Sequence, residues 1–381
     1  MTPFVVKRGI VVKNVYTPPV IQSISKKLRI GKVFYLLLIF IPISIFFGLF
    51  TKNETLTFIT SVLSIIPLAR IVGYATREIS LQTNPTISGL FSATFGNAIE
   101  LIIAVIALKN GLMEVVKASL IGSIIGNILL LVGLSILSGG LRYKHQKFNN
   151  ETIAVSSTML IIVVAGLSIP SAYKFIGSST AQEHIQILSI AVAIVMALIY
   201  IAGLIFALRT HRDLFDATDD IRDTNEKPTM SKRLAAFILL ITIIVVAVES
   251  ELLVRGMAGA ASTMGITQIF IGVVLIAIVT NIAEKATAIH FALENKLDVS
   301  IEIGLSSAIQ IALFVVPILM LVSQILHFGF DLVFTPFEIL SVVLAVMIIN
   351  YLSADGRCNW LEGAQLISVY LIIITAFFFI S

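Results

Sequence analysis

Long apolar runs separated by short polar segments make up almost the whole chain. Eleven such runs lie between turn and charge signals, at residues 33–50, 55–75, 87–108, 115–138, 152–170, 185–208, 233–253, 266–291, 299–323, 335–353 and 362–380. An α-helix needs about 20 predominantly apolar residues to cross the hydrocarbon core of a bilayer. The pattern therefore predicts an all-α polytopic membrane protein with about 11 transmembrane helices.

The composition agrees with a chain that lies mostly in lipid. Hydrophobic residues make up 57% of the sequence and charged residues only 13%, and the mean hydropathy is +1.02. Charged residues make up about 25% of an ordinary soluble domain, so this chain has about half the usual share. The single cysteine, Cys358, excludes an intramolecular disulfide and argues against a cysteine-based metal site.

The basic residues test the number of spans and their orientation. With the N-terminus in the cytoplasm, 20 of the 26 Lys and Arg residues fall on the cytoplasmic side, 5 fall on the opposite side, and Lys285 lies inside a span. Cytoplasmic loops of membrane proteins carry such an excess of positive charge. We therefore expect a cytoplasmic N-terminus and a C-terminus on the opposite side. Because the cations lie in loops and in the N-terminal arm, the net charge of +4 does not indicate a nucleic-acid partner.

Two of the apolar runs contain an acid where the bilayer would be least tolerant of one. The segment Gly96–Glu100 lies inside the run 87–108, and a second copy, Thr280–Glu284, lies inside the run 266–291. In each copy an asparagine and a glutamate three residues apart share one helical face. An acid at this depth costs roughly 2.5–3.5 kcal/mol, so it marks a functional site unless it only bonds to a neighbouring helix.

The two motifs are related by an inverted repeat. They lie in the third and the eighth span, an odd difference of five positions, so their helices run in opposite directions. Similar polar pairs follow each motif in the next span: Ser123 with Asn127 in the first half, and Ser306 with Gln310 in the second. Inverted repeats in transporters place the binding site near the bilayer midplane, at the interface between the halves.

This symmetry divides the chain into five parts. We expect a basic cytoplasmic arm at 1–32, an additional N-terminal helix at 33–50, a first five-helix repeat at 55–208, an acidic cytoplasmic linker at 209–232 and a second five-helix repeat at 233–380.

The side chains of the repeats offer oxygen ligands of the kind that suits a hard cation. Carboxylate and carbonyl oxygens are the donors that Ca²⁺ prefers, and it takes six to eight of them. The candidate ligands are Glu100, Glu284, Asn97, Asn281, Ser123, Asn127, Ser306 and Gln310. Gly96 lets its helix loosen so that nearby carbonyls can turn towards an ion, and Thr280 stands at the corresponding place in the second copy.

Two carboxylates in a cavity of low dielectric cannot both carry charge cheaply. Protons or one divalent cation relieve the repulsion between them, and the two kinds of ligand exclude one another. Such a pair predicts an exchange of cations for protons, with Glu100 and Glu284 binding either one.

The motifs resemble those of the calcium/cation:proton antiporters, a branch of the cation/Ca²⁺ exchanger superfamily. The similar segments are FGNAIELIIA at 95–104, NIAE at 281–284, SAIQIALFV at 307–315, THRDLF at 210–215 and SELLV at 250–254. The resemblance spans roughly residues 55–380. It implies a ten-helix exchanger core with one added N-terminal helix, alternating access, and binding of Ca²⁺ or protons by Glu100 and Glu284.

The second motif departs from the pattern of that family. Family members usually carry Gly-Asn-x-x-Glu-His there, whereas this chain has Thr280 and Lys285. In one alternative Lys285 acts on Glu284: it replaces the proton-binding histidine, or it reduces the negative charge left for a divalent ion. In the other, Lys285 faces a watery vestibule. Cation selectivity and proton stoichiometry depend on which of these holds.

Other acids lie near the predicted ends of the helices. Glu78 at the inner end of the second span, and Glu249 and Glu251 near the outer end of the seventh, are candidates for the pathway entrances; solvated helix ends are the alternative. The linker 209–232 is acidic, which suits either a regulatory Ca²⁺ site or a plain solvated connection.

The sequence thus predicts a secondary antiporter rather than an enzyme. We expect it to need no cofactor, to have Ca²⁺ and protons as its substrates, and to lie in a bilayer, in the plasma membrane of a prokaryote. The oligomeric state stays open. The alternatives are a Na⁺/Ca²⁺ or other cation exchanger of the same fold and a membrane-embedded hydrolase that uses the acid pair. The hydrolase lacks a nucleophile with an adjacent base.

Overall fold

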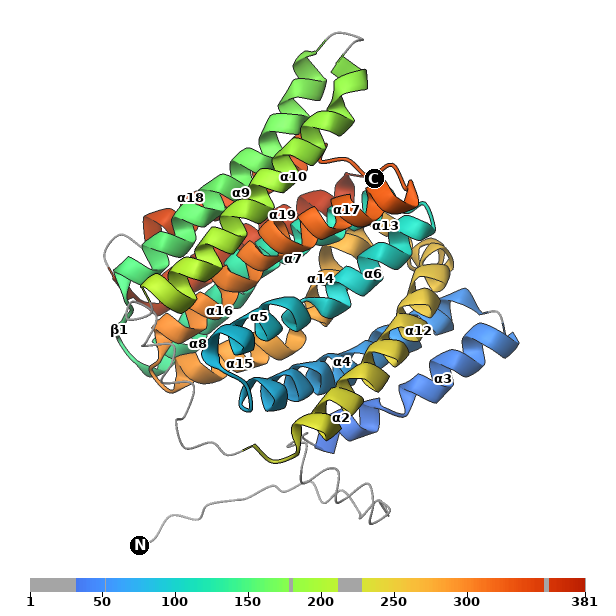
Figure 1. Cartoon of the computed structure of the whole chain (residues 1–381), viewed down its shortest axis with the longest axis horizontal. Helices are drawn as coiled ribbons and strands as arrows, with labels where there is room; N and C mark the ends of the chain where they lie inside the picture. Colours follow the sequence, from blue (N-terminus) through green and yellow to red (C-terminus); the bar gives the residue numbers. More distant parts are fainter. Residues whose placement is uncertain (1–31, 52, 178–180, 212–227, 353–355, 381) are drawn as a thin grey trace, which may run out of the picture.

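The computed structural model describes residues 32–51, 53–177, 181–211, 228–352 and 356–380. Nearly all of the predicted basic arm and most of the predicted acidic linker lie outside these residues. Helix makes up most of the described chain (Figure 1). The helices begin where the sequence supplies caps. For example, the side chains of Asn53, Asn84 and Ser231 each accept a hydrogen bond from a backbone N–H in the first turn, as N-cap residues do.

The elements up to the linker are, in chain order, α2 (Lys32–Leu37), α3 (Phe40–Phe46), the π-helical η1 (Phe47–Thr51), α4 (Glu54–Ser80), α5 (Pro85–Gly96), α6 (Ala98–Lys109), α7 (Met113–Ile125), the π-helical η2 (Gly126–Leu131), α8 (Val132–Arg142), β1 (Gln146–Lys147), α9 (Asn150–Ile176), α10 (Ala181–Ile205) and the π-helical η3 (Phe206–Thr210). Those after the linker are α12 (Lys232–Met264), α13 (Gln268–Phe270), the π-helical η5 (Ile271–Ile276), α14 (Ala277–Thr280), α15 (Ile282–Leu293), α16 (Leu297–Gln310), the π-helical η6 (Ile311–Val315), α17 (Val316–Leu326), α18 (Pro336–Leu352), β2 (Arg357–Cys358) and α19 (Trp360–Phe379).

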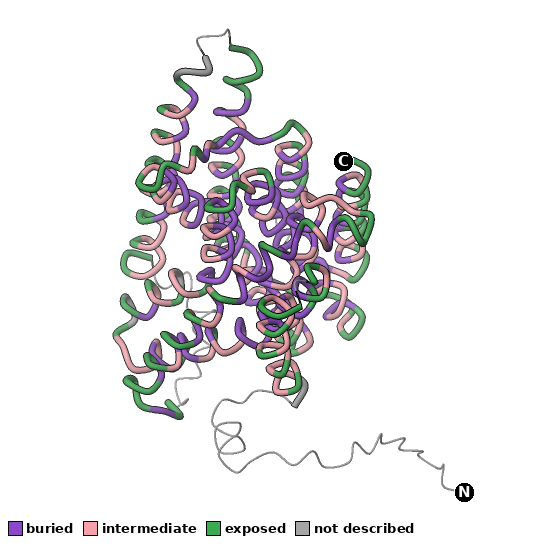
Figure 2. The backbone as a smooth tube through the Cα atoms, turned by 90° about the vertical axis from the view of Figure 1, so that its right-hand side faces the viewer, coloured by how far each residue is buried: buried purple, intermediate pink, exposed green. Residues whose placement is uncertain are grey.

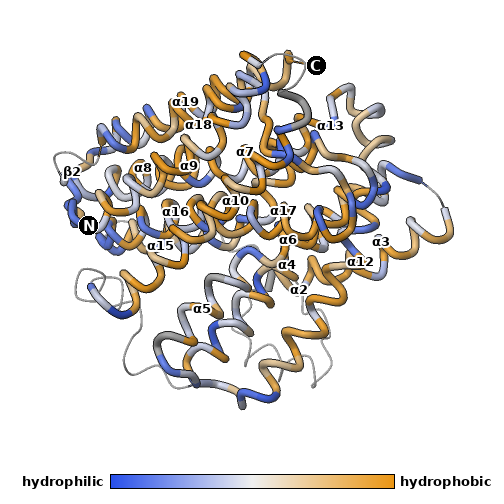
Figure 3. Tube along the Cα trace, turned by 45° about the horizontal axis from the view of Figure 1, so that its top comes forward, coloured by the Kyte–Doolittle hydropathy of each residue, from blue (hydrophilic) through white to orange (hydrophobic). Residues whose placement is uncertain are grey.

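The helices confirm a polytopic membrane architecture. Within the described residues, 8 helices are long and apolar enough to cross a membrane, and the number rises to 10 if each of two bent helix pairs is one span. The remaining predicted span corresponds to α18, an apolar helix of 17 residues. The apolar surface of the helices and the gathering of polar residues towards their ends suit a protein surrounded by lipid (Figure 3). The total of eleven spans stays a prediction.

The parts on either side of the linker contain the same kinds of element in the same order. Each begins with a long helix, α4 or α12, and continues with a broken helix. Next comes a helix with a π-helical turn near its middle, which is α7–η2–α8 in one half and α16–η6–α17 in the other. Two further helices complete each half, α9 and α10 in the first and α18 and α19 in the second.

Buried residues gather in the middle of the bundle (Figure 2), and they include most of α7 with η2 and of α16 with η6. Helices α4 and α12 pack against each other along much of their length, and α2 and α3 lie at the periphery against α4 and α12 (Figure 1). The extra N-terminal helix predicted at 33–50 corresponds to α2, α3 and η1, of which Phe34–Thr51 is long and apolar enough to cross a membrane at the edge of the bundle.

Small residues let the two halves approach closely at the centre. A Cβ on Gly122 of α7 would lie 2.1 Å from the backbone oxygen of Val273 in η5, and one on Gly272 of η5 would lie 2.9 Å from the backbone oxygen of Val115 in α7. Neither position has room for a side chain, because the obstacle is backbone in both cases. The crossing brings the broken helix of the second half against the helix that carries Asn127.

A short tether joins the loops at one end of the bundle. Strands β1 and β2 pair antiparallel, with Gln146 opposite Cys358. The Gln146 side chain donates to the backbone oxygen of Ala292, at 2.9 Å, and to Oδ1 of Asn295, at 3.1 Å. The ends of α8, α15 and α19 are therefore held together through one loop.

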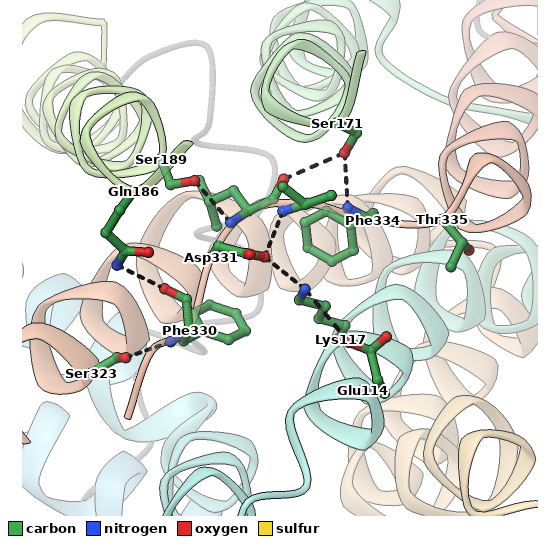
Figure 4. A network of polar contacts seen from close by, with 12 residues as sticks. Glu114, Lys117, Ser171, Gln186, Ser189, Ser323, Phe330, Asp331, Phe334 and Thr335 are labelled. Carbon is green, nitrogen blue, oxygen red and sulfur yellow. Dashed lines mark hydrogen bonds and ion pairs between the residues drawn. The ribbon is translucent and has the colours of Figure 1, made fainter. Parts of the chain in front are cut away.

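At the opposite end, the chain between α17 and α18 is extended and is held by side chains (Figure 4). Ser323, Ser189 and Ser171 accept hydrogen bonds from the backbone N–H groups of Phe330, Leu332 and Phe334, at 2.9, 3.1 and 2.8 Å. Nζ of Lys117, on α7, lies 2.7 Å from Oδ1 of Asp331. Because backbone groups outside a helix need partners at membrane depth, these side chains replace the bonds that a helix would make.

We expect Lys117→Met to destabilise the protein. The Lys117 side chain is 5% exposed and that of Asp331 is 19% exposed, so the substitution leaves a largely buried carboxylate without its cation. Loss of one partner of a buried pair costs about 3–5 kcal/mol. Thermal unfolding in detergent measures the effect.

The matched control is Glu251→Gln. It removes the pair of Glu251 with Arg255, whose side chain is 68% exposed. An exposed pair of this kind contributes about 0.2–1 kcal/mol. Equal melting temperatures for Lys117→Met and Glu251→Gln would show that the Lys117 pair does not hold the extended segment.

Candidate cation site

Both helices that carry the acidic motifs break at the same residue of the motif. Helix α5 ends at Gly96 and α6 begins at Ala98, with Asn97 between them at φ −109° and ψ 22°. Helix α14 ends at Thr280 and α15 begins at Ile282, with Asn281 between them at φ −98° and ψ 14°. The helices bend by 44° at the first break and by 57° at the second.

The breaks place each glutamate in the first turn of a half-helix. Glu100 lies in the first turn of α6, and Glu284 lies in the first turn of α15. The free N–H groups and the dipole of a helix N-terminus favour negative charge nearby. Half-helices with this orientation are a recurrent feature of transporter binding sites.

The two glutamates lie close enough to interact electrostatically. Glu100 is buried and lies near the Thr280 hydroxyl of the other half. Glu284 is partly exposed, although its Oε2 atom is buried, and it lies near the Ser307 hydroxyl on α16. The structure therefore brings both predicted acids and Thr280 into one place.

The carboxamides tie the two halves to each other. Nδ2 of Asn97 donates to Oε1 of Gln310 at 2.7 Å, and Nδ2 of Asn127 donates to Oγ of Ser307 at 2.8 Å and to Oδ1 of Asn281 at 3.5 Å. In each bond the donor belongs to the first half of the chain and the acceptor belongs to the second.

Several oxygen atoms at this place are buried and have no hydrogen-bond partner among the described residues. They are Oδ1 of Asn97, Oδ1 of Asn127 and Oε2 of Glu284. A buried polar atom without a partner costs about 1–3 kcal/mol, and these three oxygens are available as acceptors or ligands. Thr280 donates its hydroxyl proton to the backbone oxygen of Ile276, at 3.0 Å, and its oxygen accepts from Nδ2 of Asn281, at 3.1 Å, so one lone pair of that oxygen is left for a ligand.

The remaining candidate ligands do not all lie with these oxygen atoms. Ser123 is buried on α7, one turn before Asn127. Gly96 is exposed, and a Cβ there would lie 3.6 Å from Oε1 of Gln310. The Ser306 hydroxyl does not join the carboxamides. It lines a neighbouring cavity, whereas the adjacent Ser307, which the sequence interpretation passed over, contacts Asn127.

Lys285 is buried and lies at the same place. It is 6% exposed, its Nζ atom lies 3.5 Å from the backbone oxygen of Ala277, and it interacts electrostatically with both Glu284 and Glu100. A watery vestibule around Lys285 was one of the two predicted alternatives, and its burial contradicts that alternative. The lysine adds a cationic group to a site with two acids.

The acids predicted at the pathway entrances bond to other parts of the protein. Helix α12 continues to Met264, so Glu249 lies near its middle rather than near an outer end, and this part of the prediction is wrong. Glu249 is fully buried, and its carboxylate accepts hydrogen bonds from Ser44 at 2.7 Å and from Ser64 at 2.7 Å. It thereby joins α12 to α3 and α4.

Glu78 and Glu251 also have protein partners. Glu78 is buried and accepts hydrogen bonds from the backbone N–H groups of Thr229 and Met230, at 2.8 and 3.2 Å. It anchors the chain that leads into α12, which leaves no solvated helix end at this position. Glu251 pairs with Arg255 on the same helix at 2.8 Å.

The donor set is one of oxygen atoms with a single amine. Among the described residues, no group of three or more His, Cys, Asp or Glu side chains is placed to hold a metal ion. Two carboxylates, carboxamides and hydroxyls therefore supply the available ligands, which suits a hard cation better than a transition metal.

A bundle of apolar helices with two broken helices and a buried oxygen-rich centre defines a membrane transporter. The chain belongs to the sodium/calcium exchanger protein family, whose model matches residues 53–209 and 234–379. It is a multi-pass integral membrane protein of that family.

Named relatives extend over nearly the whole chain. A Ca²⁺/H⁺ antiporter of Aphanothece halophytica is 42% identical over 359 residues, which cover 91% of this chain and 96% of the relative. The Ca²⁺/H⁺ antiporter ChaA of Bacillus subtilis is 40% identical over 351 residues, which cover 91% of this chain and 99% of the relative. These relatives are transporters and not enzymes.

Solved structures show the same fold. The structure of native YfkE matches with a TM-score of 0.79 and 37% identity, over 92% of this chain and 100% of that one. The H⁺/Ca²⁺ exchanger CAX matches with a TM-score of 0.66 at 15% identity, over 91% of this chain and 92% of that one, which is a likeness of fold alone. The predicted resemblance to the cation/proton antiporters is thus confirmed.

Proposed function

We propose that the protein exchanges Ca²⁺ for protons across the membrane by alternating access, with Glu100 and Glu284 binding either the cation or protons. The observation that carries this proposal is the meeting of the two acids at matching breaks, beside the unpaired oxygens of Asn97, Asn127 and Glu284. The named relatives at about 40% identity support the choice of ions.

The oxygens at the site account for the binding of a divalent cation. Ca²⁺ takes six to eight oxygen ligands, and the site offers the Glu100 and Glu284 carboxylates, the free Oδ1 atoms of Asn97 and Asn127, and the Thr280 hydroxyl oxygen. Ser123 lies one turn before Asn127, and the backbone carbonyls before Gly96 lie next to Asn97 in the sequence, so these groups are further candidate ligands. Ser307, which lies near both Asn127 and Glu284, takes the place predicted for Ser306.

The same carboxylates account for the coupling to protons. When the cation leaves, two negative charges remain close together in a medium of low dielectric. Protons neutralise them, and a neutral site can cross between the two access states at a lower cost than a charged one. Because protons and Ca²⁺ neutralise the same atoms, the site carries one or the other.

The symmetry of the chain suits alternating access. Matching element orders and matching breaks support two five-helix repeats of inverted topology, at 55–208 and 233–380, with the additional helix at 33–50 outside them. The excess of basic residues on one side supports a cytoplasmic N-terminus, and the bacterial relatives support a plasma-membrane location. Labelling of a cysteine placed at Lys296, with a reagent that cannot cross the membrane, tests this orientation.

A second candidate function is the exchange of Na⁺ or another cation. Buried Lys285 favours it, because a positive charge beside two carboxylates leaves less negative charge for a divalent ion. Vesicles that hold a Na⁺ gradient in place of the pH gradient separate the two functions. Ca²⁺ uptake driven by Na⁺ alone would favour this second candidate.

We expect Glu100→Gln and Glu284→Gln each to abolish Ca²⁺ uptake driven by a pH gradient. Each substitution removes a charge that the cation needs while it keeps the size of the side chain. ⁴⁵Ca²⁺ flux into proteoliposomes measures the effect, and Glu251→Gln, which alters an exposed pair, is the control. Uptake that survives both substitutions would overturn the two-carboxylate mechanism.

Ser307→Ala is expected to weaken Ca²⁺ binding about tenfold, and Ser306→Ala is expected to leave it nearly unchanged. Ser307 orients the Asn127 carboxamide and lies near Glu284, whereas Ser306 lines the neighbouring cavity and its hydroxyl donates to the backbone oxygen of Ile303. Loss of one hydrogen bond to a charged or polar group costs about 1.5 kcal/mol, which is about tenfold in affinity. Calorimetric titration of detergent-purified protein with Ca²⁺ compares the two variants.

Lys285→Met is expected to raise the apparent Ca²⁺ affinity at neutral pH by roughly tenfold. The substitution removes a positive charge that repels the divalent ion, and even a screened charge at this range is worth more than about 1.4 kcal/mol. Lys285→Arg keeps the charge and is the matched control. The Ca²⁺ concentration that gives half-maximal flux measures the affinity of each variant. A weaker affinity in Lys285→Met would show that the lysine helps the site to bind Ca²⁺.

A further inference from the structure

A cavity beside the candidate cation site contains a third acid inside the bundle. Its volume is about 610 Å³, and its walls come from α9, α10, η3 and α16. The lining is mostly apolar, but Glu302, Ser156, Ser306 and Gln310 supply polar groups. Helix α16 packs against α9, whereas α10 packs against η6 and α17, which continue the helix of α16.

Helix α16 connects this cavity to the cation site. Glu302, Ser306 and Gln310 are spaced by four residues, so they follow one another along the same side of the helix. Gln310 accepts the hydrogen bond of Asn97 and is thus part of the contact between the halves. With a rise of 1.5 Å per residue, the backbone of Glu302 lies about 12 Å from that of Gln310.

Glu302 lies at the outer part of this row. It is the sixth residue of α16, about 7.5 Å along the axis from Leu297, where the helix begins after a loop predicted to be cytoplasmic. Asp298, one turn earlier, extends the row of acids and polar groups to the end of the helix. A polar row thus reaches from the predicted cytoplasmic surface to the cation site.

The Glu302 carboxylate has a hydroxyl partner but no cation among the described residues. Ser156 on α9 donates to it, with Oγ 3.2 Å from Oε1 and 3.0 Å from Oε2. On α10, Tyr200 is the other titratable group that lines the cavity. Its hydroxyl is buried and has no hydrogen-bond partner within the described chain.

The charged groups on the elements around α16 are engaged elsewhere or are exposed. Lys117 of α7 pairs with Asp331, Arg142 of α8 donates to the backbone oxygen of Leu293, and Lys285 of α15 lies beside the two site glutamates. His290 of α15 lies 3.3 Å from Glu294. Those that are exposed are Lys147 on β1, Glu151 and Lys174 on α9, His184 on α10 and Arg209 on η3.

We propose that Glu302 is a proton-binding relay through which protons, but not Ca²⁺, pass between the cytoplasm and the cation site. A carboxylate without a cation beside it can be neutralised by one proton. The mostly apolar walls offer too few oxygens to replace the water around a divalent ion. An ordered water needs two to four polar partners, so in this cavity water can bind along the row of Glu302, Ser306 and Gln310 rather than at the apolar walls.

The transfer needs no other reactant. A proton from cytoplasmic water binds a Glu302 oxygen, and the O–H bond then breaks as the proton passes through water beside Ser306 and Gln310 to Glu100 or Glu284. Release of the proton restores the Glu302 carboxylate and its bond from Ser156. In this arrangement protons and Ca²⁺ share one site but reach it by different routes. The inference rests on the proposed function.

The test compares two modes of exchange in proteoliposomes. Uptake of ⁴⁵Ca²⁺ against internal Ca²⁺ without a pH gradient needs no proton, whereas uptake against a pH gradient does. We expect Glu302→Gln to slow the proton-driven mode by roughly tenfold or more, as loss of a proton-transfer group does, and to leave the Ca²⁺-for-Ca²⁺ mode within about twofold of the unmodified protein. Glu151→Gln, an exposed acid on α9, is the control and should alter neither mode.

A second variant keeps the test decisive if Glu302→Gln lowers the melting temperature. Ala154→Phe narrows the cavity without touching Glu302 and should give the same selective loss. Equal rates in both modes, or an equal loss in both modes for a stably folded variant, would overturn the proposal. Absence of both modes in the unmodified protein would instead overturn the proposed function.

Discussion

The fold depends on one constraint: polar groups at the centre of an apolar bundle must find their partners in the other half of the chain. The Asn97–Gln310 and Asn127–Ser307 bonds meet this constraint, and both cross between the halves. Such bonds require close approach of the backbones, which the contacts of Gly122 and Gly272 allow. Breaks, π-helical turns and small residues therefore serve the same purpose. They bring two half-helices with acidic first turns to a common point in a medium that would otherwise exclude charge.

Hydrophobic runs and paired motifs were enough to predict the helical class and the family, and they single out Glu100 and Glu284 as candidate site residues. Each run is a property of neighbouring residues, and a glutamate inside one is visible without any tertiary information. Helix ends were harder to predict: α12 runs eleven residues beyond the predicted end at residue 253, because hydropathy falls before the helix stops at Gly265. The choice between Ser306 and Ser307 was beyond the sequence as well, since packing decides which side of α16 faces Asn127.

The buried acids differ in how their charge is compensated. Glu78 and Glu249 are surrounded by backbone N–H groups or hydroxyls that donate to them, so they join segments together. Glu284 keeps an oxygen without a partner, and Glu302 has a single hydroxyl beside a cavity. Sequence position gives no way to separate these groups, because all four lie in or beside helical runs. The signal that was available for Glu302 is its spacing of four and eight residues from Ser306 and Gln310.

The β1–β2 pair has a mechanical consequence. Through Gln146 it binds the loop after α8 to the end of α15 and to the start of α19, and α8 also packs against both of those helices. These three helix ends form one stiff unit at that side of the membrane. Helices α4 and α12 pack chiefly against each other, and among the described residues neither is joined to this unit by a strand pair. The β1–β2 pair therefore stiffens the side of the bundle that α8, α15 and α19 form, and the α4–α12 pair is held to it by helix packing.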